Sequence, residues 1–103
     1  MGVVYWDICQ SGSFNKNVRG PFVDSGGTTT STSATDLDNG APGAGEDIEA
    51  VVGDILTIRG DTDMRLRFGG GPASAYSGIL LTADVTEYLE VSHPGTVSVV
   101  DVA

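Results

Sequence analysis

Short runs of β-branched and apolar residues, separated by clusters of turn-forming residues, are the feature that most limits how this chain can fold. The run Met64–Phe68 alternates apolar residues with Arg65 and Arg67, as a strand with one buried face would. Fifteen glycines and four prolines interrupt the chain, and almost no segment has helical spacing. The pattern predicts an all-β fold: a compact β-sandwich or jelly-roll-like domain of about eight short antiparallel strands with little or no helix.

The candidate strands are separated by compact turns such as Gly53-Asp54, Gly60-Asp61-Thr62 and His93-Pro94-Gly95. They are Val3–Ile8, Val18–Val23, Thr28–Thr35, Ile48–Val52, Ile55–Arg59, Met64–Phe68, Ile79–Thr82, Thr86–Ser92 and Thr96–Val102. The length of 103 residues fits a single β domain spanning 1–103.

The stretch from Ser25 to Gly45 has one Leu and no aromatic residue, so it offers little apolar surface to offset the entropy of ordering it. It is either a flexible loop throughout, or a polar or edge strand over Thr28–Thr35 followed by a mobile loop. We favour the second interpretation, with a polar flexible loop around 36–47.

The charge balance limits the classes of partner. Five basic residues against 14 acidic ones give a formal charge of −9, which argues against nucleic acid and anionic membranes. Cys9 is the single cysteine and cannot form an intrachain disulfide, and no apolar run approaches the ~20 residues that span a bilayer. We see no secretory signal and expect production in the cytoplasm.

No catalytic or metal-binding constellation is apparent. His93 is the only histidine and precedes a Pro-Gly turn, so we expect a turn residue and not a catalytic base. Cys9 ends an apolar strand, where a buried, inert thiol is commoner than a reactive one. Asp36 and Asp38 begin a stretch that resembles a calcium-binding loop, but Gly40 occupies a position where an EF-hand needs a ligand.

A looser calcium site, using Asp61 with Asp63 or Asp36 with Asp38, stays open as an alternative to solvated turn carboxylates. We predict no catalytic residue, no metal and no cofactor, and therefore a protein that is not an enzyme.

The basic stripe of Arg65 and Arg67 has two interpretations. If the strand Thr86–Ser92 neighbours Met64–Phe68, Tyr88 and Glu90 share an outer face with the arginines and stabilise the sheet by ion pairs and cation–π contacts. Alternatively, the arginines meet acidic residues of another subunit.

The C-terminal two fifths of the chain resembles small β-sandwich virion proteins of tailed bacteriophages, of the capsid decoration (cement) type. The matching positions are Phe68-Gly69, Pro72–Ala75, Ile79–Leu81, Glu87–Leu89, Pro94-Gly95 and Val97–Val100.

The resemblance implies a virion protein on the capsid surface, commonly a homotrimer, which binds the major capsid protein and stabilises contacts between its subunits. The alternative is a module of the neck, tail or a fibre. A carbohydrate-binding module comes third, because the sequence reveals no cleft with convergent aromatic and carboxylate groups.

The candidate contact residues combine aromatic anchors with cations, which dominate binding energy where contacts are desolvated. They are Tyr5, Trp6, Arg65, Arg67 and Tyr88. The run Val3–Ile8 has apolar side chains on both faces, which indicates that one face packs in the core and the other contacts a partner. A lone tryptophan, however, is at least as often part of the core.

Overall fold

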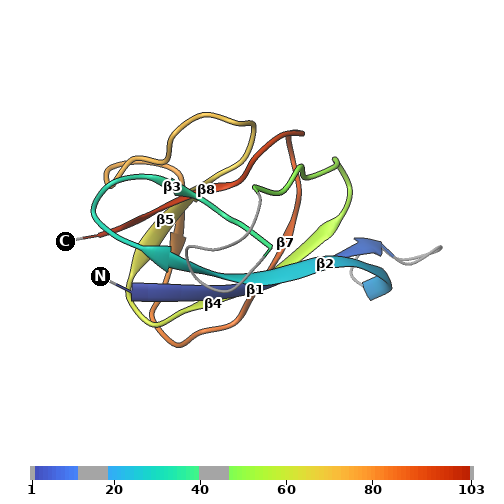
Figure 1. Cartoon of the computed structure of the whole chain (residues 1–103), viewed down its shortest axis with the longest axis horizontal. Helices are drawn as coiled ribbons and strands as arrows, with labels where there is room; N and C mark the ends of the chain where they lie inside the picture. The colour runs from blue at the N-terminus through green and yellow to red at the C-terminus, as the bar shows by residue number, and fades with distance from the viewer. Residues whose placement is uncertain (1, 12–18, 40–46, 103) are drawn as a thin grey trace.

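The computed structural model describes residues 2–11, 19–39 and 47–102, which form a β-sandwich of two four-stranded antiparallel sheets with no helix (Figure 1). The strands are β1 (Gly2–Ser11), β2 (Arg19–Thr30), β3 (Thr35–Asp36), β4 (Ile55–Gly60), β5 (Met64–Arg67), β6 (Ile79–Leu81), β7 (Glu87–Glu90) and β8 (Ser98–Asp101). Sheet A has the order β2-β1-β4-β7, and sheet B has the order β3-β8-β5-β6. The predicted all-β sandwich is confirmed.

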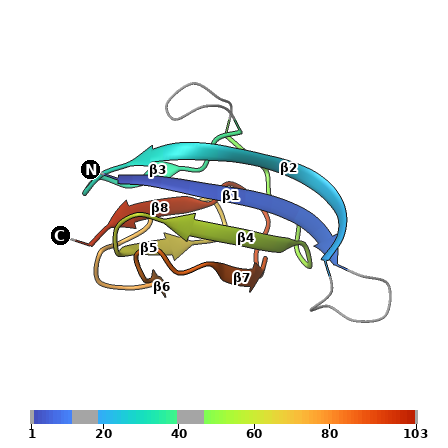
Figure 2. The same cartoon turned by 90° about the horizontal axis from the view of Figure 1, so that it is seen from below.

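Sheet A is built around β1, which pairs with β2 on one side and β4 on the other. Alternation along β1 sends Val4, Trp6 and Ile8 into the core and leaves Tyr5 on the outer face. Figure 2 shows the long β1–β2 pair running beside β4 and extending past the shorter strands.

Sheet B is centred on β8 and β5. Val99 and Leu66 are register partners, and both side chains are fully buried in the core. At the end of β8, the carboxylate of Asp101 accepts hydrogen bonds from the hydroxyls of Thr30 (2.6 Å) and Thr62 (3.2 Å). The Thr30 bond ties the last strand to the end of β2 in the opposite sheet, and the Thr62 bond ties it to the turn between β4 and β5.

The segment after β2 crosses from sheet A to sheet B and closes one side of the sandwich. Its Leu37 is fully buried, and the indole Nε1 of Trp6 donates to the Asp38 carbonyl oxygen at 3.0 Å. A methyl group added at Gly26 would collide with that same carbonyl, so only glycine permits this close approach.

The structure corrects one sequence-based prediction of local structure. Ile48–Val52 is not a strand: Ala50 makes one isolated bridge to Gly95, while Val51 and Val52 are exposed. Within the predicted loop around 36–47, Leu37 enters the core and Asp38 bridges Asp47. Residues 40–46 of this loop lie outside the described part of the chain.

The stretch Thr28–Thr35 is an edge strand only in part. Sheet A's edge strand β2 ends at Thr30, and a separate short strand, β3, begins at Thr35. The side chains of Thr28 and Thr30 are buried although they are polar. Their hydroxyls are satisfied internally: Thr28 accepts from the Asp38 N–H, and Thr30 donates to Asp101.

Candidate functional site

The outer face of sheet A carries two exposed tyrosines from different strands. Tyr5 on β1 lies opposite Arg59 on β4, and Tyr88 on β7 lies opposite Thr57 on β4. The tyrosines are 62% and 65% exposed. We call this surface the tyrosine face; its residues are Tyr5, Asp7, Thr57, Arg59, Thr86 and Tyr88.

A shallow depression of about 220 Å³ lies within the tyrosine face. It is lined by Tyr5, Trp6, Asp7, Thr57, Ile58, Arg59 and Thr86. The hydroxyl oxygen of Thr57 is buried and has no hydrogen-bond partner in the described part of the chain. The Arg59 guanidinium lies 3.9 Å from the Asp84 carboxylate, and because both side chains are exposed, this pairing is weak.

The outer face of sheet B carries the two arginines predicted as a basic stripe. Arg65 is half-buried and donates from Nη1 to the Gly78 carbonyl oxygen at 3.0 Å, which ties β5 to the residue before β6. Arg67 is exposed, and its guanidinium lies close to Gly71. Among the described residues, no carboxylate lies within ion-pair distance of either arginine.

An exposed apolar segment lies next to these arginines. Leu80 on β6 is the register partner of Arg65 and is 53% exposed, while Tyr76, in the turn before β6, is 93% exposed. We call this surface the arginine face; its residues are Arg65, Arg67, Tyr76 and Leu80.

The structure separates the predicted contact residues. The strand carrying Tyr88 pairs with β4 in sheet A, whereas Arg65 and Arg67 lie in sheet B, so the outer face that they were expected to share does not exist. Trp6 is 4% exposed and faces the core, so its side chain is not available for a surface contact. Tyr5, by contrast, is exposed, and its role as a contact residue stays a prediction.

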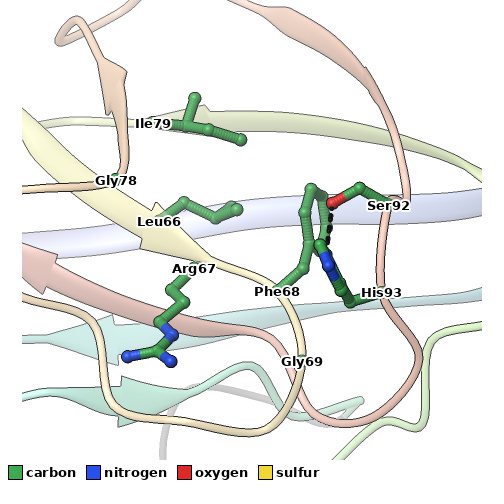
Figure 3. Close-up of a pocket in the computed structure, with 8 residues that line it drawn as sticks. All are labelled: Leu66, Arg67, Phe68, Gly69, Gly78, Ile79, Ser92 and His93. Carbon is green, nitrogen blue, oxygen red and sulfur yellow. Dashed lines mark hydrogen bonds between the residues drawn. The ribbon is translucent and has the colours of Figure 1, made fainter.

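A depression of about 370 Å³ opens at one end of the sandwich (Figure 3). Leu66, Phe68 and Ile79 supply its apolar lining, and the Ser92 hydroxyl lies 3.0 Å from His93 Nδ1. Among the residues that the structure describes, no carboxylate lines this depression to orient the imidazole of the Ser-His pair. Figure 3 shows the Arg67 side chain directed away from Leu66 and Ile79.

The carboxylates do not form a cluster suited to a metal. No group of three His, Cys, Asp or Glu residues lies close enough to hold an ion within the ranges 2–11, 19–39 and 47–102. Asp36 lies near Asp47, and its pKa is raised by burial, by the Asp47 charge and by a hydrogen bond to Asp47. The described residues also contain no helix able to cross a membrane.

Several exposed residues of these faces were not among the predicted contacts, among them Arg59, Tyr76 and Leu80. Arg59 carries the same alternation signal as Arg65, but its place beside Tyr5 depends on the pairing of β1 with β4. Leu80 lies in an apolar triplet that is typical of a buried strand, but its pairing with Arg65 places its side chain on the outer face of sheet B. No family model, curated protein or solved structure matches this chain at a significant level.

Proposed function

We propose that this chain is a non-enzymatic structural protein of a tailed-bacteriophage virion, a capsid decoration or cement protein. It binds the outer head surface and stabilises contacts between major capsid subunits. The observation that carries this proposal is the arginine face, which combines exposed aromatic and aliphatic side chains with cations in an otherwise acidic domain.

The composition of the arginine face favours a protein partner. From Phe68 to Ala83 the chain has no Asp, Glu, Lys or Arg, although its overall charge is −9. Protein interfaces are depleted of charge at their centre and enriched in aromatic residues and arginine. Leu80 and Tyr76 provide the apolar part, and Arg67 provides a cation with no carboxylate partner among the described residues.

The charge distribution also limits where the partner can bind. A partner with acidic side chains would be repelled by most of this domain and attracted only where its cations are exposed. Docking through the arginine face therefore fixes the orientation of the domain, with sheet B toward the capsid and sheet A away from it.

The proposed assembly is a homotrimer. Strand β6 is the edge of sheet B and leaves Ile79 partly exposed, and an exposed strand edge gains stability by pairing with another chain. Native mass spectrometry and light scattering measure the oligomeric state of the purified protein, and particle reconstruction measures it on the virion. Monomers both in solution and on the particle would contradict the trimer.

The proposed function is tested by adding the purified protein to heads that lack it and measuring co-sedimentation. We expect Arg67→Glu and Leu80→Asp to lower occupancy strongly. Arg59→Glu makes the same charge change at an exposed strand position on the opposite sheet and serves as the matched control. We expect it to bind as the unmodified protein does, with circular dichroism confirming the fold of every variant.

The site of binding decides between the proposed role and its alternative. Electron microscopy that places the protein on the head lattice supports a decoration protein, whereas density confined to the neck, tail or fibres would overturn it. His93→Ala should leave head binding unchanged, because a structural role does not use the Ser92–His93 pair. Wild-type occupancy by both Arg67→Glu and Leu80→Asp would refute docking through the arginine face.

A further inference from the structure

The tyrosine face lies on the sheet opposite the arginine face and is not used by the docking proposed above. We propose that the tyrosine face is a carbohydrate-binding surface that takes a neutral oligosaccharide of at least three pyranose rings. The inference does not depend on the virion role, because it concerns the isolated domain and a different set of side chains.

The two tyrosines are placed as separate stacking platforms. Tyr5 and Tyr88 lie two strands apart and are offset by two residues along β4, since their partners are Arg59 and Thr57. Strand spacing near 4.8 Å and a rise near 3.3 Å per residue put their backbones about 12 Å apart. One ring can therefore contact each end of a short oligosaccharide, whose pyranose rings present C–H groups to an aromatic face.

Both rings are open to a ligand. The residue opposite Tyr5 on β2 is Gly27, which has no side chain to cover the ring from that direction. Tyr88 is on β7, the edge strand of sheet A, so no further strand lies beyond it. This openness agrees with their exposed fractions of 62% and 65%.

Polar groups of the kind that recognise sugar hydroxyls lie between the tyrosines. The register places Asp7 and Tyr88 on either side of Thr57, and Tyr5 beside Arg59, so a carboxylate, a hydroxyl and a guanidinium share one surface. Sugar hydroxyls both donate and accept hydrogen bonds, and these side chains provide acceptors and donors.

The charges select a neutral ligand. Asp7 belongs to the face, Asp84 lies 3.9 Å from Arg59, and the chain carries −9 overall, so an anionic sugar or a nucleic acid would be repelled. A purely apolar partner is disfavoured as well, because it would desolvate the carboxylate and the hydroxyls without replacing their hydrogen bonds.

The test measures binding of cellohexaose, maltohexaose, chitohexaose and mannohexaose to the purified domain at roughly millimolar concentrations by calorimetry and by saturation-transfer NMR. We expect at least one of these to bind, and its disaccharide to bind more weakly, because a disaccharide does not span both tyrosines. Tyr5→Ala and Tyr88→Ala should each weaken binding by roughly tenfold.

Matched variants distinguish a loss of ring stacking from a non-specific loss of folding or affinity. Tyr76→Ala removes the most exposed of the described tyrosines, on the other side of the sandwich, and should leave the affinity within about twofold. Tyr5→Phe should retain binding, since stacking uses the ring and not the hydroxyl.

Failure of all four hexasaccharides to bind would overturn the proposal. So would an equal loss of affinity in Tyr76→Ala and Tyr5→Ala. If Tyr5→Ala instead changes only the oligomeric state or the occupancy on heads, the face is a protein interface and the carbohydrate assignment is wrong. Head binding by Tyr5→Ala at wild-type occupancy, with sugar binding lost, separates this proposal from the virion role.

Discussion

Replacing Trp6 by Phe tests whether this residue acts in the core and not at the surface. The indole N–H donates to the Asp38 carbonyl oxygen at 3.0 Å in a buried setting, and Phe has no donor to offer. Gly26 packs against the same carbonyl so closely that no methyl group fits there, and we expect no room for a replacement water. The variant therefore leaves a buried acceptor without a partner.

The size of the effect follows from two contributions. An unsatisfied buried carbonyl costs about 1–3 kcal/mol, and the smaller ring leaves a packing defect that costs about 1 kcal/mol more. We expect Trp6→Phe to lower the free energy of unfolding by roughly 2–4 kcal/mol, a large share of the roughly 5–15 kcal/mol of a small domain. The corresponding fall in melting temperature is roughly 10–25 °C.

Urea denaturation followed by far-UV circular dichroism measures this difference, because the variant removes the only tryptophan and its fluorescence. Tyr5→Phe, at the neighbouring exposed position, is the control and should change the free energy of unfolding by less than about 0.5 kcal/mol. A change in Trp6→Phe no larger than that of the control would refute the argument that this indole anchors the crossing segment.

Three further substitutions each test the contribution of one contact or charge to stability. Thr57→Val removes a buried hydroxyl that has no partner in the described part of the chain, and should raise the free energy of unfolding by about 1 kcal/mol in the same urea assay; a loss would contradict this. Gly26→Ala places a methyl group against the Asp38 carbonyl and should lower the melting temperature, whereas an unchanged value would show that the crossing segment moves freely. Burial and the neighbouring Asp47 raise the pKa of Asp36 above its ordinary 3.8, so this carboxyl favours folding below about pH 3.8 and that contribution is lost as the pH rises through the raised pKa. Asp36→Asn should therefore be more stable than the unmodified protein at pH 7, with the gain disappearing in melts below pH 3.8.

The fold class and most of the strands were predictable from local patterns in the sequence. Alternation along Met64–Phe68 and apolar runs such as Ile55–Arg59 are local properties, and the described strands β4 and β5 appear where these patterns predicted them. The structure of the Ser25–Gly45 stretch was harder to predict from the sequence. The burial of Leu37 depends on the crossing of the chain between the two sheets and not on its polar neighbours in the sequence.

The surface that each residue occupies became clear only from how the strands pair and pack. Both sides of β1 carry large apolar side chains, so alternation alone could not say whether Trp6 or Tyr5 faces the core. The pairing of β7 with β4 placed Tyr88 beside Thr57 in sheet A, on the opposite side of the sandwich from the arginines. The physical reason is that side-chain alternation has a range of a few residues, whereas strand partners are chosen by hydrogen bonds and core packing between segments far apart in the chain.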